Sequence, residues 1–221
     1  MRAMEKYGTI PPKFTKDWWD YIWTYYKWYF VSAFIALILI VTTAVQCANR
    51  IDYDLTVSYV GDKYFDETAQ EQVEAAMAEQ IDDADGNGQK DVFFQLLNVG
   101  GTEQTDAQYQ MAMQIKVSTE YAAGETFLYL CSKTELDSLL QTGSAGGLFV
   151  STSEWMEEGG SDTEFAVDLE GNAFFEQYGI PTDGLYMAVR AIRADEAEEQ
   201  VHVIRSANAV KLANYIINYQ A

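Results

Sequence analysis

The sequence of 221 residues has few of the residue types on which common catalytic and metal-binding motifs depend. It contains two cysteines, Cys47 and Cys131, and no Cys-x-x-Cys pair, which excludes a thiol-based zinc or redox motif. His202 is its only histidine, so an imidazole-based triad would have one candidate base and no evident partner. No nucleophile elbow, phosphate-binding loop or dinucleotide fingerprint occurs. The sequence therefore predicts a protein that is not an enzyme.

Basic residues are scarce beyond residue 50. Six of the 14 Lys and Arg and three of the 34 Asp and Glu lie in residues 1–50, so residues 51–221 hold eight basic and 31 acidic residues. A surface this acidic repels phosphate, which argues against nucleic acid and anionic lipid headgroups as its partners. Cations, basic peptides and basic proteins remain compatible with it. A simpler interpretation is that the charge only keeps an exported domain soluble.

One uncharged stretch, residues 28–49, is long enough to cross a membrane. Its 22 residues would span ~33 Å as a helix, and no polar face interrupts them. Four of the five tryptophans, interleaved with tyrosines, lie at residues 18–28. Trp and Tyr prefer the headgroup layer, so this aromatic stretch predicts an interfacial segment. An aromatic face for a partner helix is the alternative.

The charges that flank this stretch predict its orientation. Acidic residues dominate after it, and five basic residues precede it: Arg2, Lys6, Lys13, Lys16 and Lys27. This bias predicts a cytoplasmic N-terminus. A cleaved signal is disfavoured, because the preceding segment is about twice too long and Gln46 stands where a lipoprotein cleavage site needs a small residue. We therefore expect a single-pass cell-membrane protein with a cytoplasmic aromatic arm (1–27), a transmembrane helix (28–49) and an extracytoplasmic domain (51–221).

Residues 51–221 alternate apolar runs with helical patterns, which predicts one α/β domain. Strands are expected at 55–60, 92–99, 126–131 and 185–192, with shorter ones at 148–150, 165–169 and 201–204. Helices are expected after capping patterns at Thr68 and Ser132, from Thr105 to Gly124 and at 206–218. Three successive strand–helix units favour one mainly parallel sheet with helices on its faces. Residues 144–183 give the weakest pattern.

Two short motifs in this domain resemble those of a known protein family in residue type and spacing. The Ala-Ala-Gly-Glu turn at 122–125 leads into the apolar run 127–130, and Leu136, Leu139 and Gly143 follow as Leu-x-x-Leu-x-x-x-Gly. With the strand at 185–192 and the helix around 209–216, these motifs resemble extracellular solute-binding proteins of the type II periplasmic-binding-protein fold. The resemblance implies at most one full lobe plus a fragment, because residues 51–221 are too few for two lobes. The chain also departs from that family in having an expected transmembrane helix in place of a lipobox.

The turns after the three parallel strands are the first candidate site. In open parallel sheets, ligands lie beyond the carboxyl ends of the strands, where helix N-termini present amide groups. We expect a small solute or a peptide there, and ordinary turns with helix caps are the alternative. The candidate ligand-binding residues are Gly61, Asp62, Tyr64, Asn98, Gly100, Gly101, Thr102, Ser132, Lys133 and Thr134.

An acidic segment between a helix and a strand is the second candidate site. Residues 83–91 match a calcium loop of the EF-hand type, in which oxygen ligands alternate and Gly88 permits a sharp turn. Position twelve is Phe94, where a bidentate Glu is required, and Lys90 adds a positive charge. We expect a weak calcium site with a Kd of ~10⁻⁴–10⁻³ M, with a plain acidic turn as the alternative. The candidate metal ligands are Asp83, Asp85, Asn87, Gln89 and Asp91.

Together these features predict a membrane-tethered, extracytoplasmic binding or accessory module that has no catalytic activity. The alternative is a structural or assembly component of an envelope protein complex, which would act through protein–protein contacts on its outer surface or its aromatic arm. A polar, ligand-sized concavity at the strand ends would favour the first function, and a filled sheet end would favour the second.

Overall fold

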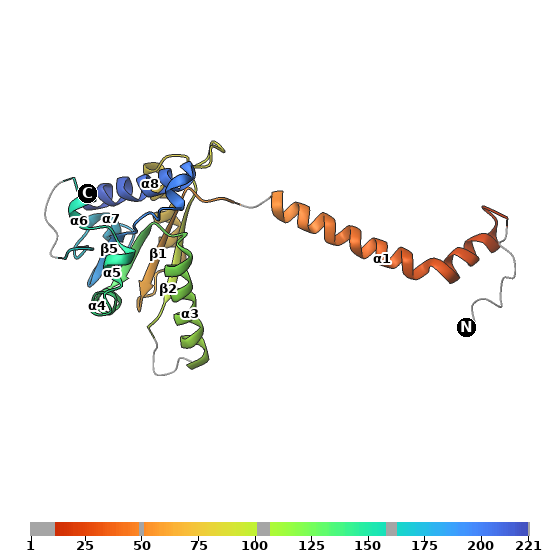
Figure 1. The fold of residues 1–221 in the computed structure, drawn as a ribbon, viewed down its shortest axis with the longest axis horizontal. Coiled ribbons are helices and arrows are strands. Elements are labelled where there is room, and N and C mark those ends of the chain that lie inside the picture. Colours follow the sequence, from red (N-terminus) through yellow and green to blue (C-terminus); the bar gives the residue numbers. More distant parts are fainter. Residues whose placement is uncertain (1–11, 49–50, 101–106, 158–162, 221) are drawn as a thin grey trace. The chain divides into compact units, whose positions relative to one another are not determined.

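The computed structural model describes residues 12–48, 51–100, 107–157 and 163–220. The chain divides after Ile51 into two units, an N-terminal helix and an α/β domain (Figure 1).

The N-terminal unit contains one long helix, α1, from Lys16 to Ala48. Thr15 begins it, because the hydroxyl oxygen of Thr15 accepts a hydrogen bond from the backbone N–H of Trp18 at 3.3 Å. The segment Tyr26–Gln46 has a mean hydropathy of 2.2, and its most apolar window is not buried at all. This helix is therefore long and apolar enough to cross a membrane, a criterion that a signal sequence would also meet.

The second unit is built on a five-stranded sheet in the order β2-β1-β3-β5-β4. Its strands are β1 (Leu55–Gly61), β2 (Val92–Asn98), β3 (Leu128–Ser132), β4 (Val167–Asp168) and β5 (Leu185–Val189). β1 pairs in parallel with both β2 and β3, as three strand–helix units predict. β5 runs antiparallel to both of its neighbours, β3 and β4. The sheet is thus mixed, and the prediction of a mainly parallel sheet holds for β1, β2 and β3.

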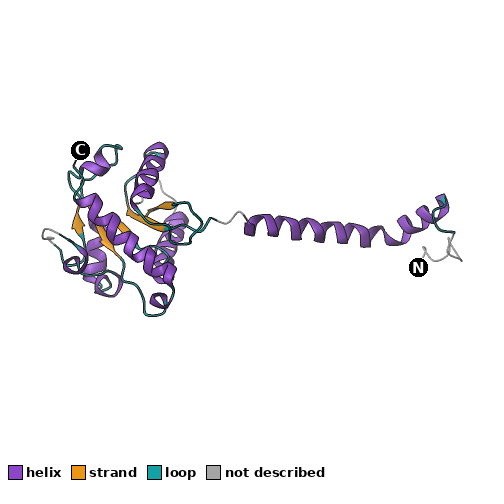
Figure 2. Cartoon of the chain, turned by 90° about the horizontal axis from the view of Figure 1, so that it is seen from above, coloured by secondary structure: helices purple, strands orange, loops and turns teal. Residues whose placement is uncertain are grey.

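Helices cover both faces of the sheet (Figure 2). Alternate strand residues point to opposite sides, so Val57 and Leu130 join one core while Val60 and Tyr129 join the other. The first core is completed by α2 (Glu67–Gln80), α6 (Thr152–Trp155), α7 (Ala173–Glu176) and α8 (Gln200–Ile217). The second core is completed by α3 (Ala107–Ala123), α4 (Lys133–Gln141) and α5 (Ala145–Leu148).

Several expected elements differ from those observed. The strand expected at 201–204 is wrong: Val201 and Ile204 lie in α8, where they share one helical face with Asn208 and Leu212. The run at 148–150 forms only an isolated bridge between Phe149 and Arg190. α2 is capped not by Thr68 but by Asp66, whose carboxylate accepts the Thr68 N–H at 3.1 Å. Ser132 does cap α4, as its capping pattern predicts, by accepting the Glu135 N–H.

Side chains of α2 cover the outer edge of β2 at Phe94. Gln70 donates from Nε2 to the Phe94 carbonyl at 2.7 Å, and the Phe94 N–H donates to Glu74 at 2.9 Å. Backbone groups of Phe94 that an edge strand would leave unpaired are therefore satisfied within the domain.

The buried side chain of Arg190, directly after β5, pairs with Glu196 and bonds to the segment before β3. The Arg190 side chain is 1% exposed, and its guanidinium contacts both carboxylate oxygens of Glu196, at 2.9 and 3.2 Å. Its Nε donates to the Thr126 carbonyl at 2.8 Å, and the group lies 4.2 Å from the centre of the Phe127 ring. The Nε bond thus ties Arg190 to the segment before β3, and the two terminal nitrogens tie it to Glu196.

Candidate functional site

Six of the residues predicted at the strand ends lie together at one edge of the sheet. Gly61 ends β1 and Asn98 ends β2, while Ser132 ends β3. The order β2-β1-β3 makes the carboxyl ends of β1 and β3 the point where the chain direction switches, which is the usual place for a ligand. The six that meet there are Gly61, Asp62, Asn98, Gly100, Ser132 and Lys133. Tyr64 and Thr134 come one or two residues further along the chain and are exposed, as are Asp62, Gly100 and Lys133, and Gly101 and Thr102 lie outside the described residues.

The polar groups at this edge mainly hold the turns themselves. The buried Tyr59 hydroxyl accepts the Lys63 N–H at 2.9 Å, and burial raises the pKa of Tyr59 to about 12. The Asn98 side chain donates to the Lys63 carbonyl at 3.3 Å and accepts from the Gly100 N–H at 3.1 Å. These bonds lock the turns after β1 and β2 to each other.

Close backbone approach explains a glycine at this edge. A Cβ on Gly61 would overlap the Tyr59 hydroxyl and lie 2.9 Å from the Ser132 Cβ, so no larger side chain fits between β1 and β3. At this position the sheet end is filled by the chain's own atoms.

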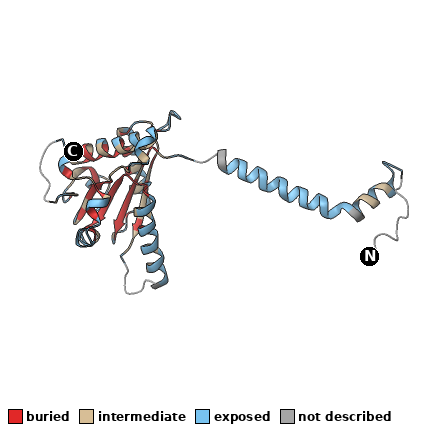
Figure 3. Cartoon of the chain, viewed as in Figure 1, coloured by how far each residue is buried: buried red, intermediate tan, exposed pale blue. Residues whose placement is uncertain are grey.

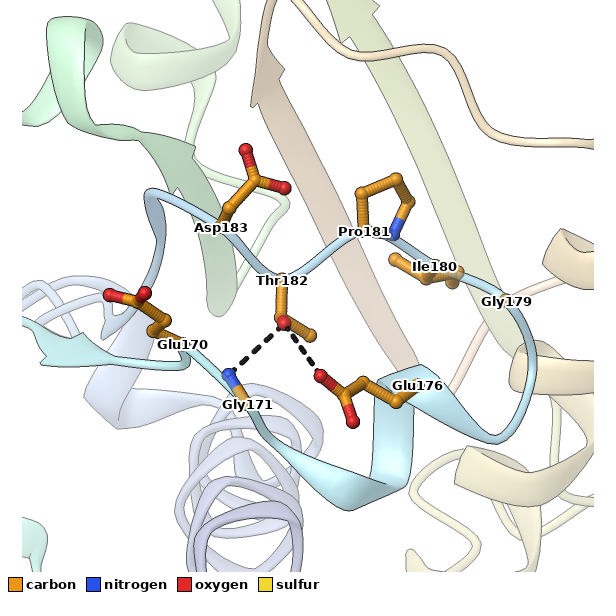
Figure 4. Close-up of a pocket in the computed structure, with 8 residues that line it drawn as sticks. All are labelled: Glu170, Gly171, Glu176, Gly179, Ile180, Pro181, Thr182 and Asp183. Atoms are coloured by element: carbon orange, nitrogen blue, oxygen red, sulfur yellow. Dashed lines mark hydrogen bonds between the residues drawn. The ribbon is translucent and has the colours of Figure 1, made fainter.

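A shallow pocket of about 530 Å³ lies in the segment that the sequence pattern leaves unassigned (Figure 4). The Thr182 hydroxyl is its buried centre, accepting from the Gly171 N–H at 3.1 Å and donating to Glu176 at 3.4 Å. Glu170, Glu176 and Asp183 line it with carboxylates, which suits a cationic group. Asp183 also pairs with Lys63 at 2.9 Å, and this contact lowers the pKa of the Asp183 carboxyl group. The one sequence signal for this pocket is the turn around Pro181.

The acidic segment between α2 and β2 folds into a loop with alternating acceptors. Asp83 accepts from the Gly86 and Gly88 N–H groups at 2.6 and 2.8 Å. Asp85 accepts from the Asn87 N–H at 2.9 Å, and the Asn87 side chain accepts from the Gln89 N–H at 2.6 Å. Gly88 has a φ of +83°, as the sharp turn of a calcium loop requires. The bonds from Gly88 and Gly86 outweigh the small effect of desolvation and lower the pKa of Asp83.

The loop meets a buried carboxylate that the sequence analysis missed. Asp54, directly before β1, is fully buried and accepts from the N–H groups of Ala84 at 2.7 Å and Asp91 at 2.8 Å. Carboxylate oxygens of Asp54, Asp83 and Asp85 all lie within 4.8 Å of one another. Asp91, by contrast, contributes its backbone N–H to this cluster. The signal in the sequence was the acidic Asp54 placed directly before the first residue of an apolar strand.

Asn208 of α8 fixes the position of the loop. Its side chain accepts from the Asp82 N–H at 2.9 Å and donates to the Asp82 carbonyl at 2.7 Å. The same amide donates to the Asp54 carbonyl at 3.4 Å. The buried side chain of Asn208 therefore holds the start of the acidic loop and the residue Asp54 next to each other.

Comparison with known proteins finds no matching family model, no similar curated protein and no similar solved structure.

Proposed function

We propose that the chain is a single-pass membrane protein whose α/β domain lies outside the cytoplasm and binds rather than catalyses. The observation that carries this proposal is the unburied apolar segment Tyr26–Gln46 of α1, in a unit separate from the folded domain. The basic residues before this segment and the acidic domain after it support the orientation. The cell envelope is then the compartment in which its ligand is to be sought.

This proposal predicts that the full-length chain stays with the membrane after alkaline carbonate extraction and leaves it only in detergent. Protease added to intact cells is expected to degrade residues 51–221, because they face outward. The mass of the purified chain separates a retained anchor from a cleaved signal. Recovery of the intact chain in the aqueous fraction, or full protection of the domain, would contradict the anchor or the orientation respectively.

The pocket around Thr182 supports the binding interpretation, and a ligand there would carry a positive charge, such as an amine or a basic peptide. The strand ends support the assembly alternative. There the side chains of Asn98, Ser132 and Tyr59 form hydrogen bonds with the domain's own backbone, which leaves fewer polar groups for a small ligand. The resemblance to one lobe of a solute-binding protein remains a prediction, and it favours the first interpretation.

We further propose that the acidic loop binds calcium. Phe94 stands at position twelve, where a calcium loop of the EF-hand type has a Glu, and Asp54 supplies a carboxylate in its place. Calcium takes oxygen ligands at 2.3–2.6 Å, so two ligands of one ion lie within about 5 Å of each other. The spacing of the Asp54, Asp83 and Asp85 oxygens suits that geometry. A cation among them would relieve the repulsion between three carboxylates held this close.

Calcium at millimolar concentration is expected to raise the Tm of the full-length protein in detergent. At a concentration about tenfold above Kd, the ion stabilises the folded state by roughly 1.4 kcal/mol. Magnesium is the control ion, because it demands a tighter octahedral site and gives up its waters reluctantly. An unchanged Tm with calcium, or an equal rise with magnesium, would count against a calcium site.

A further inference from the structure

Helix α3 exposes an unusually large part of its surface. Val117 is the only buried residue among those of α3 whose side chains are described, and Met113 and Tyr121 are partly buried against the second core. Figure 3 shows almost the whole helix in the colour of exposed residues. On its outward side, Met111 is 65% exposed and Ile115 is 61% exposed. The helix is therefore held to the sheet by one face only, and large apolar side chains point away from it.

The outward residues form a regular stripe, the α3 seam, which comprises Met111, Ile115, Ser118 and Ala122. Their spacing of four, three and four residues is that of the contact positions in two-stranded helical packing. Thr119 lies beside them. The hydroxyls of Ser118 and Thr119 donate to the carbonyls of Gln114 and Ile115 at 2.8 Å, so burying them would leave no donor unsatisfied.

The α3 seam carries no charge, although the domain holds eight basic and 31 acidic residues. α3 has two charged residues whose side chains are described, Lys116 and Glu120. Glu120 accepts a hydrogen bond from Thr126 and therefore turns toward the sheet. The exposed face of α2, in contrast, carries Glu67, Glu71 and Glu79. A partner at the α3 seam thus meets an apolar, neutral surface on an otherwise strongly acidic domain.

We propose that the α3 seam is the contact between two copies of this chain. Two acidic domains repel each other most where acidic faces meet, and contact through this face places no acidic side chain of the seam against another. A basic partner would gain nothing from a surface without acids, whereas a second copy offers an identical stripe through a two-fold axis. One helix pair is small beside the ~1,200 Å² of the smaller stable interfaces, so the contact depends on the proposed membrane tether, which concentrates the copies.

Disulfide cross-linking of the full-length chain in membranes tests this contact. Cys47 is first replaced by Ser, and Cys131 is buried and stays. Ser118→Cys is then compared with Gln72→Cys, an exposed position on α2, under copper-phenanthroline oxidation. We expect on the order of tenfold more disulfide-linked dimer from Ser118→Cys, because only this thiol meets its own copy. Adding Ile115→Glu should reduce the dimer to the Gln72→Cys level, since two like charges would then face each other.

Two results would overturn the proposal. One is equal cross-linking of the Ser118→Cys and Gln72→Cys chains in the membrane fraction. The other is a Ser118→Cys adduct whose mass corresponds to a different protein, which would make that protein the occupant of the seam. An unchanged Tm for Ile115→Glu verifies that this exposed substitution leaves the fold intact. Loss of the chain from the membrane fraction would instead contradict the tether and hence the proposed function.

Discussion

Replacing Glu196 with Gln is expected to destabilise the α/β domain by about 3 kcal/mol, because removal of one partner leaves the buried Arg190 guanidinium without its counter-charge. The Arg190 side chain is 1% exposed and that of Glu196 is 12% exposed, so water cannot replace the lost carboxylate. Gln retains one acceptor oxygen, which limits the loss. For a domain of this size the corresponding fall in Tm is roughly 6–12 °C.

Glu198→Gln is the matched control for this experiment, because Glu198 is exposed and lies in the same short helix, Glu196–Glu198. Urea unfolding followed by circular dichroism measures both variants. The pH gives a second readout: burial opposes ionisation of Glu196, but hydrogen bonds from Arg190 and from the Arg193 N–H prevail and lower its pKa. Its contribution is therefore present above the unfolded pKa and is lost as the pH falls through the folded value. If Glu196→Gln unfolds like Glu198→Gln, the pair does not stabilise the fold.

Substitution of Asp54 is expected to have a similarly large effect and to separate the folding of the acidic loop from ion binding. Asp54→Ala removes the acceptor for the Ala84 and Asp91 N–H groups, at ~1–3 kcal/mol for each donor left buried without a partner. Asp54→Asn keeps one acceptor oxygen and should lose less stability. Both variants should respond less to calcium than the unchanged chain, because the third carboxylate of the cluster is gone. Asp54→Ala should respond least, because it also lacks the oxygen that Asn keeps.

The measurement for this prediction is the Tm of each full-length variant with and without calcium. Glu71→Gln serves as the control, since it also removes one negative charge but from an exposed side chain of α2. A calcium response in Asp54→Ala equal to that of the unchanged chain would show that Asp54 is not a ligand. A normal Tm for Asp54→Ala would show that the loop does not depend on its bonds to this carboxylate.

The sequence predicted the elements whose apolar periodicity is strong. The positions of β1, β2 and β3, to within two residues at each end, and the cap of α4 by Ser132 follow from local pattern, and so does the apolar part of α1. The start of α8 was misread, because Val201 and Ile204 alone fit a strand and only their spacing to Asn208 reveals the helix. The antiparallel direction of β5 depends on its long-range pairing with β3, which no local pattern encodes.

The candidate site was predictable only where its residues are contiguous. Asp83, Asp85 and Asn87 follow one another in the loop, so their alternation was visible in the sequence. Asp54 and Asn208 lie far from them along the chain and meet them through the packing of β1 and α8. The pocket around Thr182 was missed for a different reason: short helices and a two-residue strand leave too few residues for any period to appear.

The bonds from Gln70 and Glu74 to Phe94 have a consequence for encounters between copies of this chain. Free backbone groups on an edge strand can pair with the edge strand of another copy, and repeated pairing of this kind builds a ribbon. Because the backbone groups of Phe94 are already bonded to α2, a second copy cannot pair with β2 at this residue. The domain thereby interrupts the template near the middle of its edge strand.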